Sequence, residues 1–202
     1  MLFRSAFVGT FSTYHNPQAM VEAAMALRHR NDLAFVLMGS GDLDQSLRSQ
    51  GRGLTNVFFT GWLDSTDIST VLRSSHLGLC TSGKLSEREF LPNKVFAYLA
   101  EGVPIGSIFD GELRRLIETR GFGFNFSTTA QLIAEIQTLA DAPQRHAAMV
   151  EAAKSFFASD CDANVIYRDY ADHLESIAGR ADHLDDLGFI SEQMETDRKS
   201  TR

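Results

Sequence analysis

The stretch Leu91-Pro-Asn-Lys-Val-Phe-Ala-Tyr-Leu-Ala-Glu-Gly-Val-Pro-Ile105 predicts a short helix that leads directly into a buried strand. Pro92 suits the first helical position, because it has no backbone N–H to lose and its φ is already near the helical value. Gly102 supplies a left-handed stop, and Pro104 prevents the helix from continuing. The apolar run from Val103 to Phe109 then begins a new strand.

Outward from this stretch, apolar strand-like runs alternate with helical segments joined by short turns. The other expected strands are 6–11, 33–38, 56–60, 77–80 and 122–126, and the expected helices are 17–30, a short one ending near 50, 65–74, 111–120, 128–140 and 143–158. Continuous apolar strands are typical of parallel sheets, which are buried on both faces. The pattern predicts an α/β fold, a doubly wound, Rossmann-like parallel sheet of about six strands with helices on both faces.

The character of the chain changes near residue 160. We predict an α/β domain over 1–160, a helical extension over 161–190 that includes an amphipathic helix at 164–177, and a tail at 191–202. The tail is polar and charged, so it cannot bury enough apolar surface to fold, and we expect it to be disordered.

Composition excludes several classes of function. A net charge of -7 argues against a nucleic-acid partner, which needs clustered Lys and Arg. No apolar run reaches the roughly 20 residues of a membrane span. The cysteines Cys80 and Cys161 are far apart, and the histidines have no metal-ligand spacing, so we predict neither a metal nor a cofactor. Cysteine usage favours the cytoplasm.

The sequence Pro92-Asn-Lys-x-Phe-x-Tyr-Leu-Ala-x-Gly-x-Pro104 resembles the donor-site signature of retaining GT-B glycosyltransferases of group 1 (family 4), which use nucleotide sugars. In that family an acidic residue, seven residues and a second Glu precede Ala-Gly-x-Pro. The first acid corresponds to Glu89. The second, which holds the ribose, corresponds to Ala97 and is lost. Glu101 lies one turn beyond Ala97 and could replace it.

The resemblance implies roles for the loop before this helix and for the helix start. Glu89 would act as the catalytic residue and contact the hydroxyls of the transferred sugar, beside the backbone from Phe90 through Leu91 and Pro92 to Asn93, in which every residue but the proline offers an N–H group. Lys94 would neutralise diphosphate oxygens as a point charge. A loop that feeds a helix N-terminus also favours anions. The alternative is that Ser86-Glu-Arg-Glu89 is only a solvated charge run.

The turn after the first strand, Gly9-Thr-Phe-Ser-Thr-Tyr-His15, would approach the diphosphate. The family often places a basic residue at the position of His15 and Arg or Thr at that of Thr10. A cation is needed there because the leaving nucleotide gains charge as the glycosidic bond breaks. His15 is mostly neutral at pH 7 unless its pKa is raised, so the alternative is an exposed turn histidine.

Two further turns follow the second and third strands. Gly39-Ser-Gly41 is no complete dinucleotide fingerprint, but Gly39 and Gly41 lie at a strand end, where ligands bind in such sheets. Gly61-Trp62-Leu63 resembles the turn that receives the nucleobase. The Trp62 ring could stack on a base or pack on a helix, and we favour packing. Asp110-Gly-Glu112 resembles the family's Gly-x-Glu turn, although a carboxylate at a helix start is favourable in any case.

The resemblance implies the donor-binding, carboxy-terminal half of a glycosyltransferase, a hexosyltransferase of polysaccharide biosynthesis with a saccharide or lipid-linked acceptor. Its partners would be a nucleotide sugar and a missing amino-terminal acceptor domain or chain, which would supply any contact with a membrane surface at its cytoplasmic face. This chain alone should not transfer sugar. The alternative is a non-catalytic nucleotide-binding or regulatory module. A flavodoxin-like or receiver domain fits the strand pattern, but the acidic cluster that a receiver needs is missing.

Overall fold

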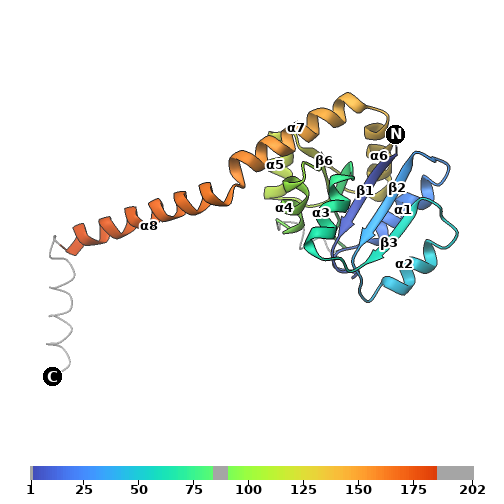
Figure 1. Cartoon of the computed structure of the whole chain (residues 1–202), viewed down its shortest axis with the longest axis horizontal. Coiled ribbons are helices and arrows are strands. Elements are labelled where there is room, and N and C mark those ends of the chain that lie inside the picture. Colours follow the sequence, from blue (N-terminus) through green and yellow to red (C-terminus); the bar gives the residue numbers. More distant parts are fainter. Residues whose placement is uncertain (1, 84–90, 186–202) are drawn as a thin grey trace, which may run out of the picture. The chain divides into compact units, whose positions relative to one another are not determined.

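The computed structural model describes residues 2–83 and 91–185 (Figure 1). The chain divides into two compact units, Met1–Ser159 and Asp160–Arg202. The first is an α/β unit, and the described part of the second is one helix. The predicted division into 1–160, 161–190 and 191–202 stays a prediction, and the tail at 191–202 lies outside the described residues.

A six-stranded parallel sheet forms the centre of the first unit, in the order β3-β2-β1-β4-β5-β6. The strands are β1 (Phe3–Val8), β2 (Leu33–Met38), β3 (Val57–Gly61), β4 (Leu77–Cys80), β5 (Ile105–Ser107) and β6 (Gly123–Asn125). This confirms the predicted fold class. From β1 the chain adds β2 and β3 on one side, and it then returns to add β4, β5 and β6 on the other side. Ligands bind at such switch points in the strand order, beyond the carboxyl ends of the strands.

Helices cover both faces of the sheet (Figure 1). They are α1 (Gln18–Ala26), α2 (Asp44–Gln50), α3 (Ser65–Arg73), α4 (Lys94–Ala100), α5 (Glu112–Arg120), α6 (Thr129–Ala140) and α7 (Pro143–Asp160). Helix α1 contacts both α2 and α6. Local signals fix several ends, because the side chains of Asp64 and Thr128 accept hydrogen bonds from N–H groups in the first turns of α3 and α6, and Gly121 ends α5 in the left-handed conformation.

Two predicted strands differ from the observed ones by more than one residue at an end. Strand β1 begins at Phe3 and ends at Val8, because Gly9, with φ of 138°, bends the chain and leaves the buried Phe11 beyond the last strand residue. Strand β5 ends at Ser107 and not at Phe109, because the N–H of Phe109 donates to the Ser107 hydroxyl at 3.0 Å and the chain leaves the sheet. The continuous apolar runs correctly predicted that Phe11 and Phe109 are buried, but these residues do not pair with a neighbouring strand.

The side chain of Tyr98 fastens α4 to the centre of the sheet. Its hydroxyl accepts a hydrogen bond from the N–H of Val8 at 3.1 Å and donates one to the carbonyl of Leu79 at 3.2 Å. The ring is fully buried and lies so close to Gly78 that any Cβ there would overlap it. Lys94 lies one helical turn before Tyr98, so it shares the helix face that meets β1 and β4.

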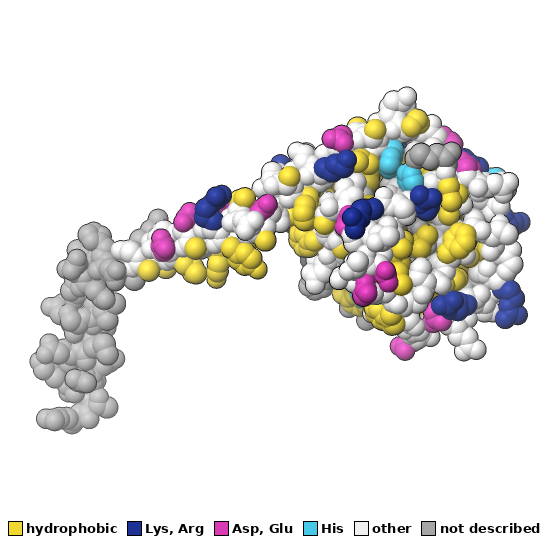
Figure 2. Space-filling view, viewed as in Figure 1, with side chains coloured by type: hydrophobic (Ala, Val, Ile, Leu, Met, Phe, Trp, Pro, Cys, Tyr) yellow, Lys and Arg dark blue, Asp and Glu magenta, His cyan; other side chains and the backbone are white. Residues whose placement is uncertain are grey.

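The second unit contains the helix α8 (Ala163–Asp185), which confirms the predicted amphipathic helix and extends it. One side of α8 carries hydrophobic side chains that are exposed to solvent (Figure 2): Ile166, Tyr167, Tyr170, Leu174 and Ile177. None of the helices in residues 2–83 and 91–185 combines the length and the apolar character needed to cross a bilayer.

Candidate functional site

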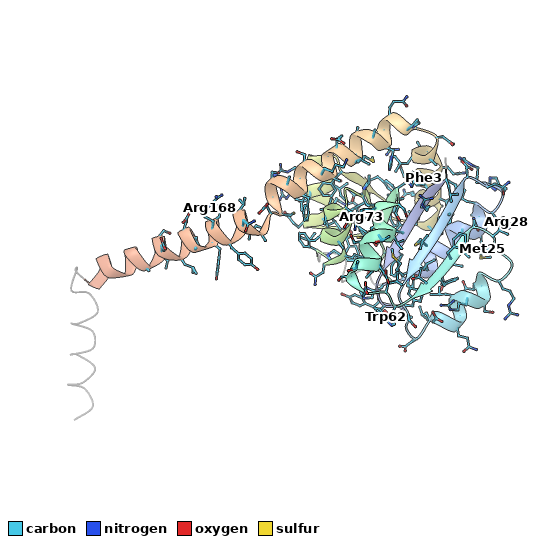
Figure 3. All side chains as sticks on the ribbon, in the orientation of Figure 1. Phe3, Met25, Arg28, Trp62, Arg73 and Arg168 are labelled. Carbon is cyan, nitrogen blue, oxygen red and sulfur yellow. The ribbon has the colours of Figure 1, made fainter. Side chains whose placement is uncertain are left out.

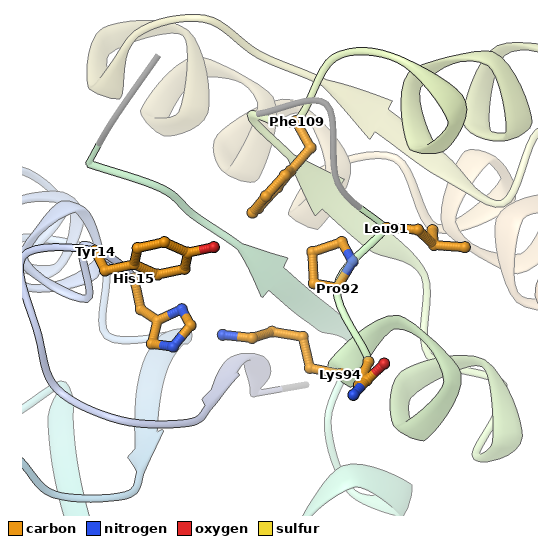
Figure 4. Close-up of a pocket in the computed structure, with 7 residues that line it drawn as sticks. Tyr14, His15, Leu91, Pro92, Lys94 and Phe109 are labelled. Atoms are coloured by element: carbon orange, nitrogen blue, oxygen red, sulfur yellow. The ribbon is translucent and has the colours of Figure 1, made fainter. Parts of the chain in front are cut away.

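A pocket of about 340 Å³ lies beyond the carboxyl ends of β1, β4 and β5 (Figure 4). Its walls come from three places in the sequence: the loop between β1 and α1, the start of α4 with the residues before it, and Phe109, two residues after β5. The lining residues are Tyr14, His15, Leu91, Pro92, Asn93, Lys94 and Phe109. The pocket therefore lies at the switch point of the sheet, where this class of fold binds its ligands.

Lys94 is the first residue of α4, and its side chain reaches into the pocket (Figure 4). The Nζ atom lies 4.1 Å from the centroid of the Phe7 ring. It is buried, and among the described residues it has no hydrogen-bond partner. Burial lowers the pKa of this amine below its usual range. A buried lysine without an acceptor is costly to the folded state, so it indicates a place for an anion.

His15 and Tyr14 approach Lys94 from the opposite wall (Figure 4). Their rings meet edge-on with centroids 4.7 Å apart. The backbone of this loop is fixed, because the Thr81 hydroxyl donates to the carbonyl of His15 at 2.6 Å and the N–H of Gly83 donates to that of Tyr14 at 2.9 Å. Burial, and secondly the charge of Lys94, lower the pKa of His15.

Gly9 leaves room for the lysine amine, since a Cβ at that position would lie 3.2 Å from Nζ of Lys94. Thr10 follows Gly9 but is exposed and is absent from the pocket wall. Of the three residues expected to receive the diphosphate from this turn, the structure therefore brings His15 and the backbone of Gly9 to Lys94.

The glycines after β2 serve close packing between loops. A Cβ at Gly39 would overlap the carbonyl oxygen of Gly9, and one at Gly41 would crowd the backbone of Phe11. The N–H of Gly39 donates to the carbonyl of Gly61 at 2.8 Å. Neither Gly39 nor Gly41 lines the pocket that contains Lys94.

The turn that was expected to receive the nucleobase lies at the end of β3. Gly61, Trp62 and Leu63 do not line the pocket around Lys94. The Trp62 ring is 66% exposed and lies at the surface (Figure 3), so the packing role that we favoured for it does not describe this structure. Its position after a strand did not reveal whether the Trp62 ring would be buried or exposed.

Ala97 and Glu101 occupy different surroundings. Ala97 is half-buried on α4 and does not line the pocket. The carboxylate of Glu101 accepts a hydrogen bond from the Ser69 hydroxyl and lies 3.5 Å from Nε of Arg73, both on α3. Glu101 therefore connects α4 to α3, and this geometry gives it no place at the pocket.

The predicted catalytic residue Glu89 and its neighbour Phe90 lie outside the described residues. Their roles stay predictions, as do those of Leu91, Pro92 and Asn93, although these three line the pocket. Asp110 and Glu112 form ion pairs with Arg114 and Arg115 at the surface. Within residues 2–83 and 91–185, no group of three His, Cys, Asp or Glu side chains is placed to hold a metal.

Sequence reasoning missed two lining residues, Tyr14 and Phe109. Tyr14 is an aromatic residue in an otherwise polar turn, which was a usable signal for a binding surface. Phe109 was taken as the end of a buried strand, and only the turn at Ser107 places it over the pocket.

A sequence-family model described as glycosyl transferases group 1 matches residues 3–142. Solved structures with the same fold include Anabaena HepE in complex with UDP, with a TM-score of 0.75 and 20% identity over 87% of this chain and 49% of HepE. A complex of HepE with UDP-glucose gives a TM-score of 0.73. The C-terminal domain of the group 1 glycosyl transferase LpcC from Francisella tularensis gives 0.70 at 17% identity, over 80% of this chain and 87% of that domain.

This chain thus spans about half the length of HepE and most of the LpcC domain. A search of curated protein sequences gave no match.

Proposed function

Because this chain belongs to the glycosyl transferases group 1 family, we propose that it is the donor-binding half of a retaining glycosyltransferase and binds a nucleotide diphosphate sugar. The observation that carries the proposal is the buried, unpartnered amine of Lys94 in the wall of the switch-point pocket. A diphosphate would supply the acceptors that this amine lacks. The complexes of HepE with UDP and UDP-glucose make uridine nucleotides the first ligands to test.

The transfer reaction would need an amino-terminal half that holds a saccharide or lipid-linked acceptor. Catalysis requires donor and acceptor to be positioned together, so this chain alone should bind the donor without transferring sugar. Glu89 is the residue that we propose to face the transferred sugar. The setting would be the cytoplasm or the cytoplasmic face of a membrane, in polysaccharide biosynthesis.

A second candidate is a nucleotide-binding module without catalysis. It is favoured by Ala97, which offers no carboxylate to a ribose. Both candidates predict nucleotide binding, and they separate only when the chain is assayed with its acceptor half.

Isothermal titration of the chain with UDP, GDP and ADP, and with their glucose conjugates, tests the binding itself. We expect one of these series to bind with a Kd between about 1 µM and 1 mM, which corresponds to about -8 to -4 kcal/mol. We expect a Kd near the weak, millimolar end of this range, because the carboxylate that would hold the ribose is missing. The absence of heat from all six ligands at millimolar concentration would contradict the proposal.

Restoring the missing carboxylate should strengthen binding. Ala97 lies three residues after Lys94 on α4, so the substitution Ala97→Glu would place an acceptor near the proposed ribose position. A charged hydrogen bond contributes about 1.5–3 kcal/mol, and desolvation offsets part of it, so we expect a gain of about tenfold in affinity.

Glu101→Ala is the matched comparison for Ala97→Glu. Because the Glu101 carboxylate is held by Ser69 and Arg73, we expect this change to leave nucleotide affinity unaltered. Weaker binding by Glu101→Ala, with no gain from Ala97→Glu, would move the ribose to Glu101 and contradict the placement proposed for it.

A further inference from the structure

The amine of Lys94 has surroundings that oppose its charge. The Phe7 ring lies at 4.1 Å, Gly9 adjoins the amine on the side where a Cβ would crowd it, and the described residues supply no hydrogen-bond acceptor to Nζ. A cation that is removed from water without an acceptor favours its neutral form, and the lowered pKa of Lys94 follows from this burial.

A second base faces the same space. His15 lies across the pocket from Lys94, and the two groups repel one another when both are protonated (Figure 4). The other titratable groups that the structure describes near this space offer no compensating charge. Burial raises the pKa of the Cys80 thiol, on β4, to about 12, and the hydroxyl of Tyr98 is occupied by the backbone of Val8 and Leu79. The ring of Tyr14 stands edge-on beside that of His15.

No carboxylate among the described residues forms an ion pair with Lys94. Among the described residues, this basic pair therefore has no anion beside it, and an arriving diphosphate would bring negative charge to both groups. Such a ligand reverses the electrostatic balance, because an adjacent opposite charge favours the protonated form of both bases.

We propose that Lys94 and His15 together take up a proton from solvent when the diphosphate of the donor enters the pocket, so that donor binding is coupled to pH. This inference rests on the proposed function. The balance is simple: the neutral base, one proton and the anionic ligand combine to give the protonated base paired with the ligand. Affinity therefore falls as pH rises, by at most tenfold per pH unit for each proton taken up.

The test is the titration of the full chain with UDP-glucose at pH 8.0 in HEPES and in Tris, two buffers with very different ionisation enthalpies. The diphosphate of UDP-glucose is diesterified, so the ligand itself has no group that titrates near this pH. Because the buffer must give up the proton, we expect binding to release less heat in Tris, with an uptake of about 0.5–1 proton.

The possible outcomes separate the two proposals. Equal heats in both buffers, with binding intact, would overturn the proton uptake and leave the proposed function standing. The absence of binding by UDP-glucose and the other nucleotides would overturn the proposed function and this inference with it. A Lys94→Arg variant has a permanent charge, so if it binds, its uptake should be smaller than that of the parent chain.

Direct observation of the amine covers the case in which Lys94→Arg fails to fold. The chain has four lysines, so ¹³Cε-labelled lysine gives a simple NMR spectrum, and the exposed Lys154 provides the reference signal. Without ligand, the pKa of Lys94 should lie below the usual range of a lysine amine, and UDP-glucose should raise it. Titration of Lys94 within the usual lysine range in the free chain would overturn the inference.

Discussion

Replacing Lys94 by Met is expected to lower the affinity for the nucleotide diphosphate sugar by about tenfold to 150-fold and, at the same time, to stabilise the fold. The affinity is lost because a charged hydrogen bond to the diphosphate contributes about 1.5–3 kcal/mol. The stability rises because an unpartnered buried amine is exchanged for a thioether of similar length beside the Phe7 ring. We expect a gain of about 1–3 kcal/mol in the free energy of unfolding.

A loss of nucleotide affinity together with a gain in the free energy of unfolding distinguishes a lysine that binds ligand from one that stabilises the fold. Lys154→Met is the matched control, because Lys154 is exposed and pairs only weakly with Glu151 at 3.4 Å. It should change neither calorimetric affinity nor urea unfolding by more than about 0.5 kcal/mol. If Lys94→Met destabilises the chain and leaves binding intact, Lys94 is part of the core and not of a ligand site.

Replacing Gly39 by Ala should lower the free energy of unfolding by about 3 kcal/mol or more. Gly39 has φ of 143°, which side-chain-bearing residues rarely adopt, and its Cβ would overlap the carbonyl oxygen of Gly9. The loops after β1 and β2 would have to separate. For a chain of this size, we expect the melting temperature to fall by about 6–12 °C.

Gly53→Ala is the matched control for this substitution. Gly53 also has a positive φ, 82°, but a Cβ there would meet nothing within 4 Å. It should therefore show only the backbone strain, about 1–2 kcal/mol. Thermal melts of the two variants separate the effect of backbone strain, present in both, from that of the steric overlap, present only in Gly39→Ala. Similar losses of stability in both variants would contradict the close approach of Gly39 to Gly9.

Much of the fold could be predicted because its signals are local. The apolar runs at 33–38 and 77–80 coincide with β2 and β4, and the glycine after Arg120 ends α5 as expected. The bounds of β1 were missed because Phe11 is as apolar as the strand residues and is buried without pairing. Which residues pair depends on the register between strands distant in sequence, and no local pattern carries that information.

The candidate site also has features that the sequence predicts and features that depend on the fold. The signature around Lys94 could be identified from the sequence, but the lack of a partner for its amine depends on Phe7, Gly9 and His15 meeting from separate elements. For the same reason, helical spacing suggested Glu101 as a replacement carboxylate, whereas its partners Ser69 and Arg73 come from the neighbouring helix. Sequence gives residue chemistry, while the compensation of a buried charge is decided by three-dimensional neighbours.

The most direct test of nucleotide binding at this pocket is a titration of the ¹⁵N-labelled chain with UDP-glucose, followed by amide NMR shifts. We predict progressive shifts for His15, Asn93 and Lys94, which line the pocket, and for Gly9, which adjoins the Lys94 amine, with unchanged signals on α2 and on the exposed face of α6. The same titration of Lys94→Met should show much weaker changes. Shifts confined to other surfaces, or none at millimolar ligand, would contradict the claim that this pocket receives the donor.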